Sequence, residues 1–150
     1  MRFRIPPLLL TAVLAAVMYF VAGRLPVWHL PGSYDEIAGV LLVVSGIVFA
    51  AAGVVSFRRV RTTVNPIKVD SVSTLVTTGV YRISRNPMYV GFCGVLSGWA
   101  VLLGSVFAFA IVLAFFWYLD RFQIAAEEKV LAELFGERYT DYCSKVRRWL

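Results

Sequence analysis

MYVGFCGVLSGWAVLLGSVFAFAIVLAFFWYL, residues 88–119, is the longest stretch of this chain without a charged side chain. As one straight helix its 32 residues would be about 48 Å long at 1.5 Å per residue. A bilayer core of about 30 Å needs only about 20 residues. Gly104 and Ser105 lie near the middle of the stretch, where a sharp bend is possible. The stretch therefore predicts a tight helical hairpin with arms at about 88–103 and 106–120.

Two further stretches lack charged side chains, residues 5–23 and residues 37–57. Each is long enough to cross the bilayer as a helix. For the first stretch a cleaved signal peptide is an alternative, although residues 20–23 form a poor cleavage site. The fold class we expect is an all-α integral membrane protein with four transmembrane helices. The expected spans are residues 5–23, 37–57, 88–103 and 106–120.

The basic residues indicate the orientation of these spans. Arg2 and Arg4 precede the first span, basic residues are frequent between Arg58 and Arg85, and six more follow Asp120. Lys and Arg near membrane spans mark the cytoplasmic side. Both termini and the segments 58–87 and 121–150 are therefore expected in the cytoplasm, which requires an even number of crossings. The hairpin satisfies that requirement.

The overall composition agrees with a membrane protein. Hydrophobic residues make up 59% of the 150 residues and charged residues 16%, and the mean hydropathy is +0.74. Soluble domains contain about 25% charged residues, and a soluble domain of this size exposes too much surface to hide so many apolar side chains. Disordered chains are poor in apolar residues. We therefore expect one integral membrane domain, residues 1–150.

Several function classes are excluded by the inventory of residues. The net charge of +6 comes from basic residues that flank apolar stretches, which argues against nucleic-acid binding. With Cys93, Cys143 and the single histidine His29, the chain offers no ligand set typical of a metal site. The uncharged stretches lack the intramembrane ionisable groups of a transporter or channel. Any chemistry is therefore expected at the cytosolic face.

Small residues recur at helical spacing in the second and third stretches. Gly39, Gly46, Ala50 and Gly53 share one face, and Gly91, Gly94 and Gly98 share another. Small residues let membrane helices approach closely. We interpret both faces as helix-packing surfaces.

The first polar segment of interest is STLVTTGVYRISRNPMYVG, residues 73–91. Asn86 followed by Pro87 predicts a helix start, with Asn86 as the cap and Pro87 at the first helical position. A helix N-terminus beside Arg82 and Arg85 is suited to a carboxylate or phosphate. A basic loop that contacts lipid headgroups is the alternative.

The second polar segment begins where the last span leaves the membrane, at residues 121–129. Gln123 and Glu127 are four residues apart and share a helix face. Glu127 and Glu128 point about 100° apart, so only one of them can face inward with Gln123. We expect Glu127 to bind a ligand ammonium or ribose hydroxyl groups, and Glu128 to be solvated. Further on, Gly136 predicts a break between two helices, and the basic and aromatic residues 147–149 are typical of a membrane-interface anchor.

Together the run LVTTGVYRISRNPMYVG, the hydrophobic hairpin and the run EEKVLAELFGERYTDYCSKVRRW resemble the isoprenylcysteine carboxyl methyltransferase family, a group of membrane phospholipid methyltransferases. The resemblance covers about residues 71–150. It implies an S-adenosylmethionine site without a Rossmann fold, and this sequence has no strand followed by a Gly-rich dinucleotide loop. The family's cofactor-binding positions correspond to Thr74, Leu75, Val76, Tyr81, Asn86, Pro87, Met88, Tyr89 and Glu127.

The sequence departs from the family pattern at one cofactor-binding position and at one position on the acceptor side. Asn86 stands where many members have histidine, and asparagine keeps a donor and an acceptor but does not titrate. Gln123 stands where the family has an arginine for the acceptor carboxylate, and glutamine cannot form a bidentate charged clamp. On the acceptor side, where we expect the catalytic groups, Arg85 and Gln123 are the candidates.

The expected function is methyl transfer from S-adenosylmethionine to a lipophilic acceptor in the membrane, without a metal. Methyl transfer from a sulfonium needs in-line positioning more than acid–base catalysis, so the lack of a catalytic histidine is no objection. The acceptor is open between a prenylated carboxylate, an amine headgroup and an isoprenoid or quinone-like molecule. A bacterial inner membrane, with its lipids as partners, is the expected location. The alternative is a catalytically inactive small membrane transporter or assembly subunit of the same fold.

Overall fold

The computed structural model describes residues 5–25, 34–59 and 74–150. Arg2, Arg4, His29 and most of the basic segment after Arg59 lie outside these residues, so the orientation inferred from them stays a prediction. The described residues form helices and no strands, which confirms the all-helical fold. The helices are α1 (Pro7–Ala22), α2 (Tyr34–Arg59), the 3₁₀ helix η2 (Gly79–Arg82), α3 (Pro87–Leu102), α4 (Val106–Tyr118), the π-helix η3 (Leu119–Ile124), α5 (Ala125–Phe135) and α6 (Glu137–Lys145).

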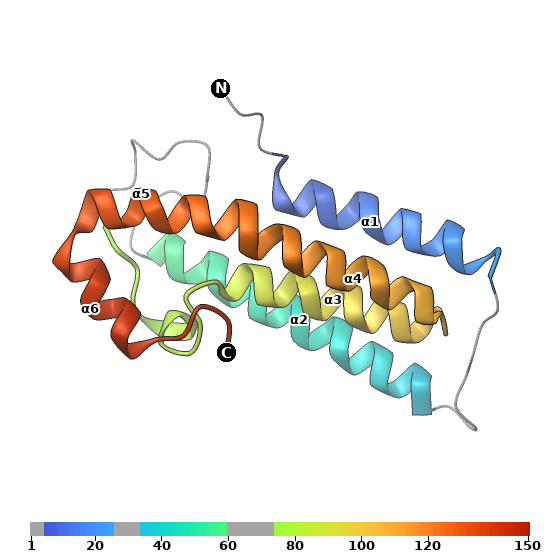
Figure 1. Cartoon of the computed structure of the whole chain (residues 1–150). Coiled ribbons are helices and arrows are strands. Elements are labelled where there is room, and N and C mark those ends of the chain that lie inside the picture. Colours follow the sequence, from blue (N-terminus) through green and yellow to red (C-terminus); the bar gives the residue numbers. More distant parts are fainter. Residues whose placement is uncertain (1–4, 26–33, 60–73) are drawn as a thin grey trace.

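The four apolar helices α1 to α4 form an elongated bundle in which successive helices run in opposite directions (Figure 1). The end of α2, the start of α3, and α5, α6 and the C-terminus all lie at the same end of the bundle. The turn between α3 and α4 lies at the opposite end.

α2 and α3 pack against each other through the predicted small-residue faces. A Cβ atom on Gly46 would lie 2.6 Å from the carbonyl oxygen of Gly91, and one on Gly91 would lie 2.5 Å from the carbonyl oxygen of Gly46. At the other end of the pair, a Cβ on Gly98 would lie 2.6 Å from the carbonyl oxygen of Gly39. Side-chain atoms essentially never approach backbone so closely, so only glycine permits this contact. The packing role predicted for both faces is confirmed.

The opposite side of α3 packs against α1 and α4. Met18, Leu96, Ala100 and Phe115 are buried between these helices. The indole Nε1 of Trp99 donates a 3.0 Å hydrogen bond to the carbonyl oxygen of Ala15 and so joins α3 to α1. Glycine on one face and bulky side chains on the other fix α3 as the central helix.

The predicted hairpin between α3 and α4 is confirmed. Gly104 turns the chain with a φ of 58°, and α4 begins two residues later. Beyond Tyr118 the helix does not stop but continues through η3 into α5, so Val106–Phe135 is one helix of 30 residues. A π-turn adds a residue to one turn of the helix, and such turns are frequent at functional sites.

The exposed surface of the bundle is apolar, as expected beside lipid. On α2 only Asp35, Gly39, Gly46 and Gly53 are buried, and many of its large apolar side chains are exposed, among them Leu41, Ile47 and Val48. Among the described residues, two helices, Tyr34–Arg59 and Val106–Phe135, are long and apolar enough to cross a membrane. The 16-residue helices α1 and α3 are each about 24 Å long. Their crossing, and hence the number of four spans, stays a prediction.

Candidate functional site

At the end of the bundle where α3 begins, polar side chains from both predicted segments meet. The phenol of Tyr89, in the first turn of α3, donates a 2.8 Å hydrogen bond to Oε1 of Glu127 on α5. The amide Nε2 of Gln123 donates to the same oxygen at 2.6 Å and lies 3.4 Å from the Tyr89 hydroxyl. Gln123 is only 2% exposed, so its amide is held by these contacts. The structure therefore brings together three of the predicted site residues.

Tyr81 lies next to this group. It is buried in η2, its ring packs edge-on against Phe57 with centroids 5.2 Å apart, and its carbonyl oxygen accepts a 2.6 Å hydrogen bond from the Tyr142 hydroxyl. Burial raises the pKa of the Tyr81 phenol well above its ordinary value, and the nearby Tyr142 and Glu127 raise it further. Tyr81 is therefore a neutral aromatic wall beside the Glu127 carboxylate.

A second polar group lies beside the first and is built on the carboxylates of Asp120 and Glu128. Arg85 binds Oε1 of Glu128 at 2.9 Å. Arg148 binds both oxygens of Glu128 and donates to both oxygens of Asp120 at 3.2 and 3.3 Å. The prediction that Glu128 is solvated is wrong, because its side chain is 18% exposed and held between two guanidinium groups. The hydrogen bonds and ion pairs with Glu128, and more weakly those with Asp120, raise the pKa of Arg148.

The second guanidinium comes from the C-terminal strap, which we define as residues 146–150. Its backbone binds the loop before α3: the amide of Arg85 donates to the carbonyl oxygen of Arg147 at 3.0 Å, and Nδ2 of Asn86 donates to that of Arg148 at 3.0 Å. The indole of Trp149 donates to Oδ1 of Asp120 at 2.8 Å and packs on Phe116. The residues expected to anchor at lipid headgroups thus bind protein carboxylates.

The remaining predicted residues surround these two groups. Asn86 precedes α3 and Pro87 is its first residue, as predicted, but the Asn86 side chain does not cap the helix because it binds the strap. The backbone amide of Asn86 donates a hydrogen bond to Oγ of Ser84 at 3.0 Å. Met88 packs toward α2, where its Cγ would lie 2.9 Å from a Cβ on Gly53.

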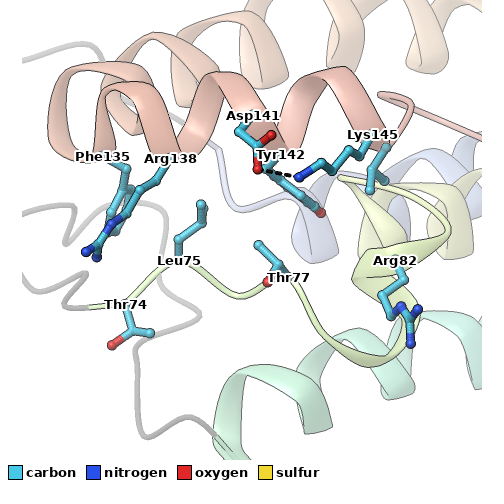
Figure 2. A pocket seen from close by; sticks show the side chains of 10 residues that line it. Thr74, Leu75, Thr77, Arg82, Phe135, Arg138, Asp141, Tyr142 and Lys145 are labelled. Carbon is cyan, nitrogen blue, oxygen red and sulfur yellow. Dashed lines mark hydrogen bonds and ion pairs between the residues drawn. The ribbon is translucent and has the colours of Figure 1, made fainter.

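The residues at 74–76 lie further from Glu127, along a cavity of about 730 Å³. Thr74 and Leu75 line this cavity, while Val76 is buried beside it. Figure 2 shows Leu75 and Thr77 between Arg138 and Arg82, with Tyr142 on the wall formed by α6. The hydrogen bond of Tyr142 to Tyr81 connects this wall to the aromatic side of the Glu127 group.

The residues present fit a ligand that carries one positively and one negatively charged group. Glu127 offers a carboxylate for a ligand cation, with the rings of Tyr81 and Tyr89 nearby. Nε of Arg85 is buried without a hydrogen-bond partner among the described residues, so it is a donor available to a ligand anion. The donor set therefore suits the ammonium and carboxylate groups of S-adenosylmethionine.

Sequence reasoning missed Arg148, Asp120 and Trp149. A signal was present, because Asp120 is the first charged residue after the long apolar stretch and a carboxylate at such a boundary needs a partner. The sequence did not indicate which basic residue is the partner, since Arg148 lies 28 residues further along the chain.

Comparison with known proteins identifies the family to which the chain is similar, over a range that includes residues 73–91 and 121–129. A profile of the phospholipid methyltransferase family matches residues 34–138. A probable protein-S-isoprenylcysteine O-methyltransferase of Oryza sativa subsp. indica is 36% identical over 115 residues, 75% of this chain and 59% of that protein. The protein-S-isoprenylcysteine O-methyltransferase B of Arabidopsis thaliana is 32% identical over 111 residues, 72% of this chain and 55% of that protein.

A shorter relative is also similar. An uncharacterized protein of Haemophilus influenzae is 41% identical over 63 residues, 42% of this chain and 100% of that protein. The chain spans less than three fifths of the length of the plant relatives. The profile match covers well over half of this chain and includes α2 to α5. The chain belongs to the phospholipid methyltransferase family.

Proposed function

We propose that this protein transfers a methyl group from S-adenosylmethionine to a lipophilic acceptor at the membrane, with an S-prenylated cysteine carboxylate as the acceptor. The observation that carries the proposal is the 2.8 Å hydrogen bond between Tyr89 and Glu127, which joins the two family segments into one polar site. The acceptor follows from the names of the plant relatives, which are protein-S-isoprenylcysteine O-methyltransferases.

The cofactor, when bound, supplies an electrophilic methyl group on a sulfonium. Glu127 binds its ammonium group, and Arg85 binds its carboxylate through the available Nε donor. Tyr81 and Tyr89 offer aromatic faces to the adenine or the sulfonium cation. The cavity along Thr74 and Leu75 admits the cofactor from the cytosol.

On the acceptor side, the apolar part of the acceptor stays in the bilayer and its reactive group enters beside Gln123 and Arg85. A carboxylate acceptor is already ionised at neutral pH and needs no general base. The residues therefore contribute by positioning, which supplies up to about 7–11 kcal/mol in the best intramolecular reactions. Gln123 provides hydrogen bonds but no charge, so its role is orientation of Glu127 and the acceptor.

The test is transfer of a labelled methyl group. The purified protein in lipid bilayers is incubated with S-adenosylmethionine labelled on its methyl group and an S-farnesylated cysteine derivative with a free carboxylate. We expect base-labile labelled methyl ester from the wild type and at least about tenfold less from Glu127→Gln, since a hydrogen bond to a charged group contributes about 1.5–3 kcal/mol. The matched control is Glu133→Gln, because Glu133 is an exposed carboxylate on the same helix α5.

The acceptor and the activity are separated by a second arm of the same experiment. Total membrane lipids replace the farnesylated compound, and labelled products are separated by whether base releases the label. Label only in base-stable lipids would replace the carboxylate acceptor by an amine headgroup or an isoprenoid. No label in either arm would favour the inactive transporter or assembly subunit and contradict the proposal.

A further inference from the structure

The C-terminal strap, residues 146–150, contacts both halves of the candidate site through one residue. The guanidinium of Arg148 binds Asp120 and Glu128 on the helix Val106–Phe135. The backbone carbonyl oxygen of Arg148 accepts hydrogen bonds from two residues before α3, Asn86 and, at 3.4 Å, Ser84. These contacts are separated by 20 to 64 residues in sequence. We infer that Arg148 is a positioning residue that sets the direction of the Glu127 side chain; the inference rests on the proposed function.

The geometry of the helix explains why Arg148 affects Glu127. Successive residues of an α-helix are about 100° apart, so the direction of Glu128 determines that of Glu127. Arg85 and Arg148 hold Glu128 on one side of α5, and Glu127 then faces Tyr89. A rotation of α5 that released Glu128 would move Glu127 away from the Tyr89 hydroxyl.

The π-helix gives this rotation a place to occur. η3, Leu119–Ile124, contains Asp120 and ends where α5 begins, and π-turns interrupt the regular hydrogen-bond ladder of a helix. Arg148 bridges the interruption, because Asp120 lies within η3 and Glu128 lies beyond it. Its guanidinium therefore fixes the two parts of the helix relative to each other.

Arginine is suited to this bridge and lysine is not. The planar guanidinium offers five donors in a fixed arrangement, and here they reach two carboxylates at once. A lysine ammonium can neutralise one carboxylate but cannot hold two in a defined geometry.

The exposure of these groups distinguishes positioning from general stabilisation. The side chains of Arg148 and Asp120 are 35% and 34% exposed, so water and salt screen this ion pair and it contributes little to the free energy of unfolding. Glu128 is 18% exposed, but it keeps its 2.9 Å ion pair with Arg85 when the Arg148 side chain is removed. Loss of the Arg148 side chain is therefore expected to displace Glu127 more than to unfold the protein.

The test compares the full-length variants Arg148→Gln and Arg148→Lys with Arg147→Gln. Arg147 is the matched control, since it is the adjacent arginine of the strap and its side chain is exposed. S-adenosylmethionine binding is measured by calorimetry in detergent, KM and kcat by methyl transfer, and folding by thermal unfolding. Displacement of a binding group by about 1 Å can change a rate about 100-fold.

We expect Arg148→Gln to raise Kd and KM for S-adenosylmethionine about 10- to 100-fold, with Arg148→Lys between it and the wild type and Arg147→Gln unchanged. A purely structural role would lower activity in proportion to the folded fraction, leave Kd and KM unchanged, and overturn the inference. If Arg148→Gln does not fold, Arg148→Lys and Asp120→Asn decide by the same readouts. A wild type that binds no S-adenosylmethionine would overturn the proposed function and the inference with it. If the wild type binds S-adenosylmethionine and Arg148→Gln, or the variant used in its place, binds it with the same affinity, the inference alone is overturned.

Discussion

The hydroxyl group of Tyr89 lies 2.8 Å from Oε1 of Glu127, although the two residues are 38 positions apart in the sequence. The α3–α4 hairpin between them runs to the far end of the bundle and back, so it returns the chain to the place where it left. Two polar segments that are distant in the sequence thereby form one carboxylate site beside aromatic rings.

Tyr89→Phe removes the hydroxyl and keeps the ring. We expect the affinity for S-adenosylmethionine to fall by about tenfold, because a hydrogen bond to a charged carboxylate contributes about 1.5–3 kcal/mol and part of it is replaced by water. The measurement is calorimetry on the purified variant. Tyr19→Phe is the control, since Tyr19 is an exposed tyrosine on α1. Equal affinities of the two variants would show that the Tyr89 hydroxyl does not orient Glu127.

Gly46→Ala and Gly91→Ala place a methyl group within 2.6 Å of the backbone of the facing helix. We expect each change to separate α2 from α3 and to lower the free energy of unfolding by about 1–3 kcal/mol. Thermal unfolding in detergent measures the loss. In the control Gly23→Ala the nearest atom to the new methyl is 3.6 Å away. Unfolding temperatures that match this control would contradict the close packing of α2 on α3.

Tyr81 makes stability depend on pH in the alkaline range. Below a pH of about 10 the Tyr81 phenol is protonated in both the folded and the unfolded chain. Above this pH the phenol of the unfolded chain loses its proton, whereas the buried phenol of the folded chain keeps it because burial raises its pKa. The free energy of unfolding is therefore expected to fall as pH rises above about 10, by up to about 1.4 kcal/mol per pH unit. Thermal unfolding from pH 8 to about 11 should show a shallower decline for Tyr81→Phe. An equal decline in both proteins would contradict this assignment.

The orientation in the membrane is tested at the C-terminus. Leu150 is exposed, so a reporter can follow it without entering the bundle. We expect a fluorescent-protein fusion to fold in the cytoplasm and a phosphatase fusion to be inactive, because the basic segments mark the cytoplasmic side. An active phosphatase fusion would place the C-terminus outside and contradict the cytoplasmic location predicted for residues 121–150.

Much of the fold could be predicted because it depends on local patterns. The uncharged stretch between Arg85 and Asp120 is too long for one crossing, and basic residues on both sides of it require the chain to return, so a hairpin near Gly104 follows. The glycine faces follow from helical spacing. The proximity of Tyr89 and Glu127 follows from the hairpin, since both lie next to its two open ends.

The strap and the π-helix could not be predicted in the same way. Residues 146–150 are too short for periodicity, and their basic and aromatic character is equally typical of a membrane-interface anchor. The solvated position expected for Glu128 assumed that only one face of α5 is covered. Because the strap covers a second face, Glu128 is enclosed by Arg85 and Arg148. Long-range ion pairs of this kind have no signature in the spacing of residues.

Binding of S-adenosylmethionine at Glu127 is tested most directly by calorimetric titration of the purified wild-type protein, alongside Glu127→Gln and Glu133→Gln. We predict saturable binding to the wild type and to Glu133→Gln, and binding at least about tenfold weaker to Glu127→Gln, because the glutamine amide cannot attract the ligand ammonium as a carboxylate does. Absence of binding to the folded wild type, or binding that is unchanged in Glu127→Gln, would contradict a role of Glu127 in binding S-adenosylmethionine.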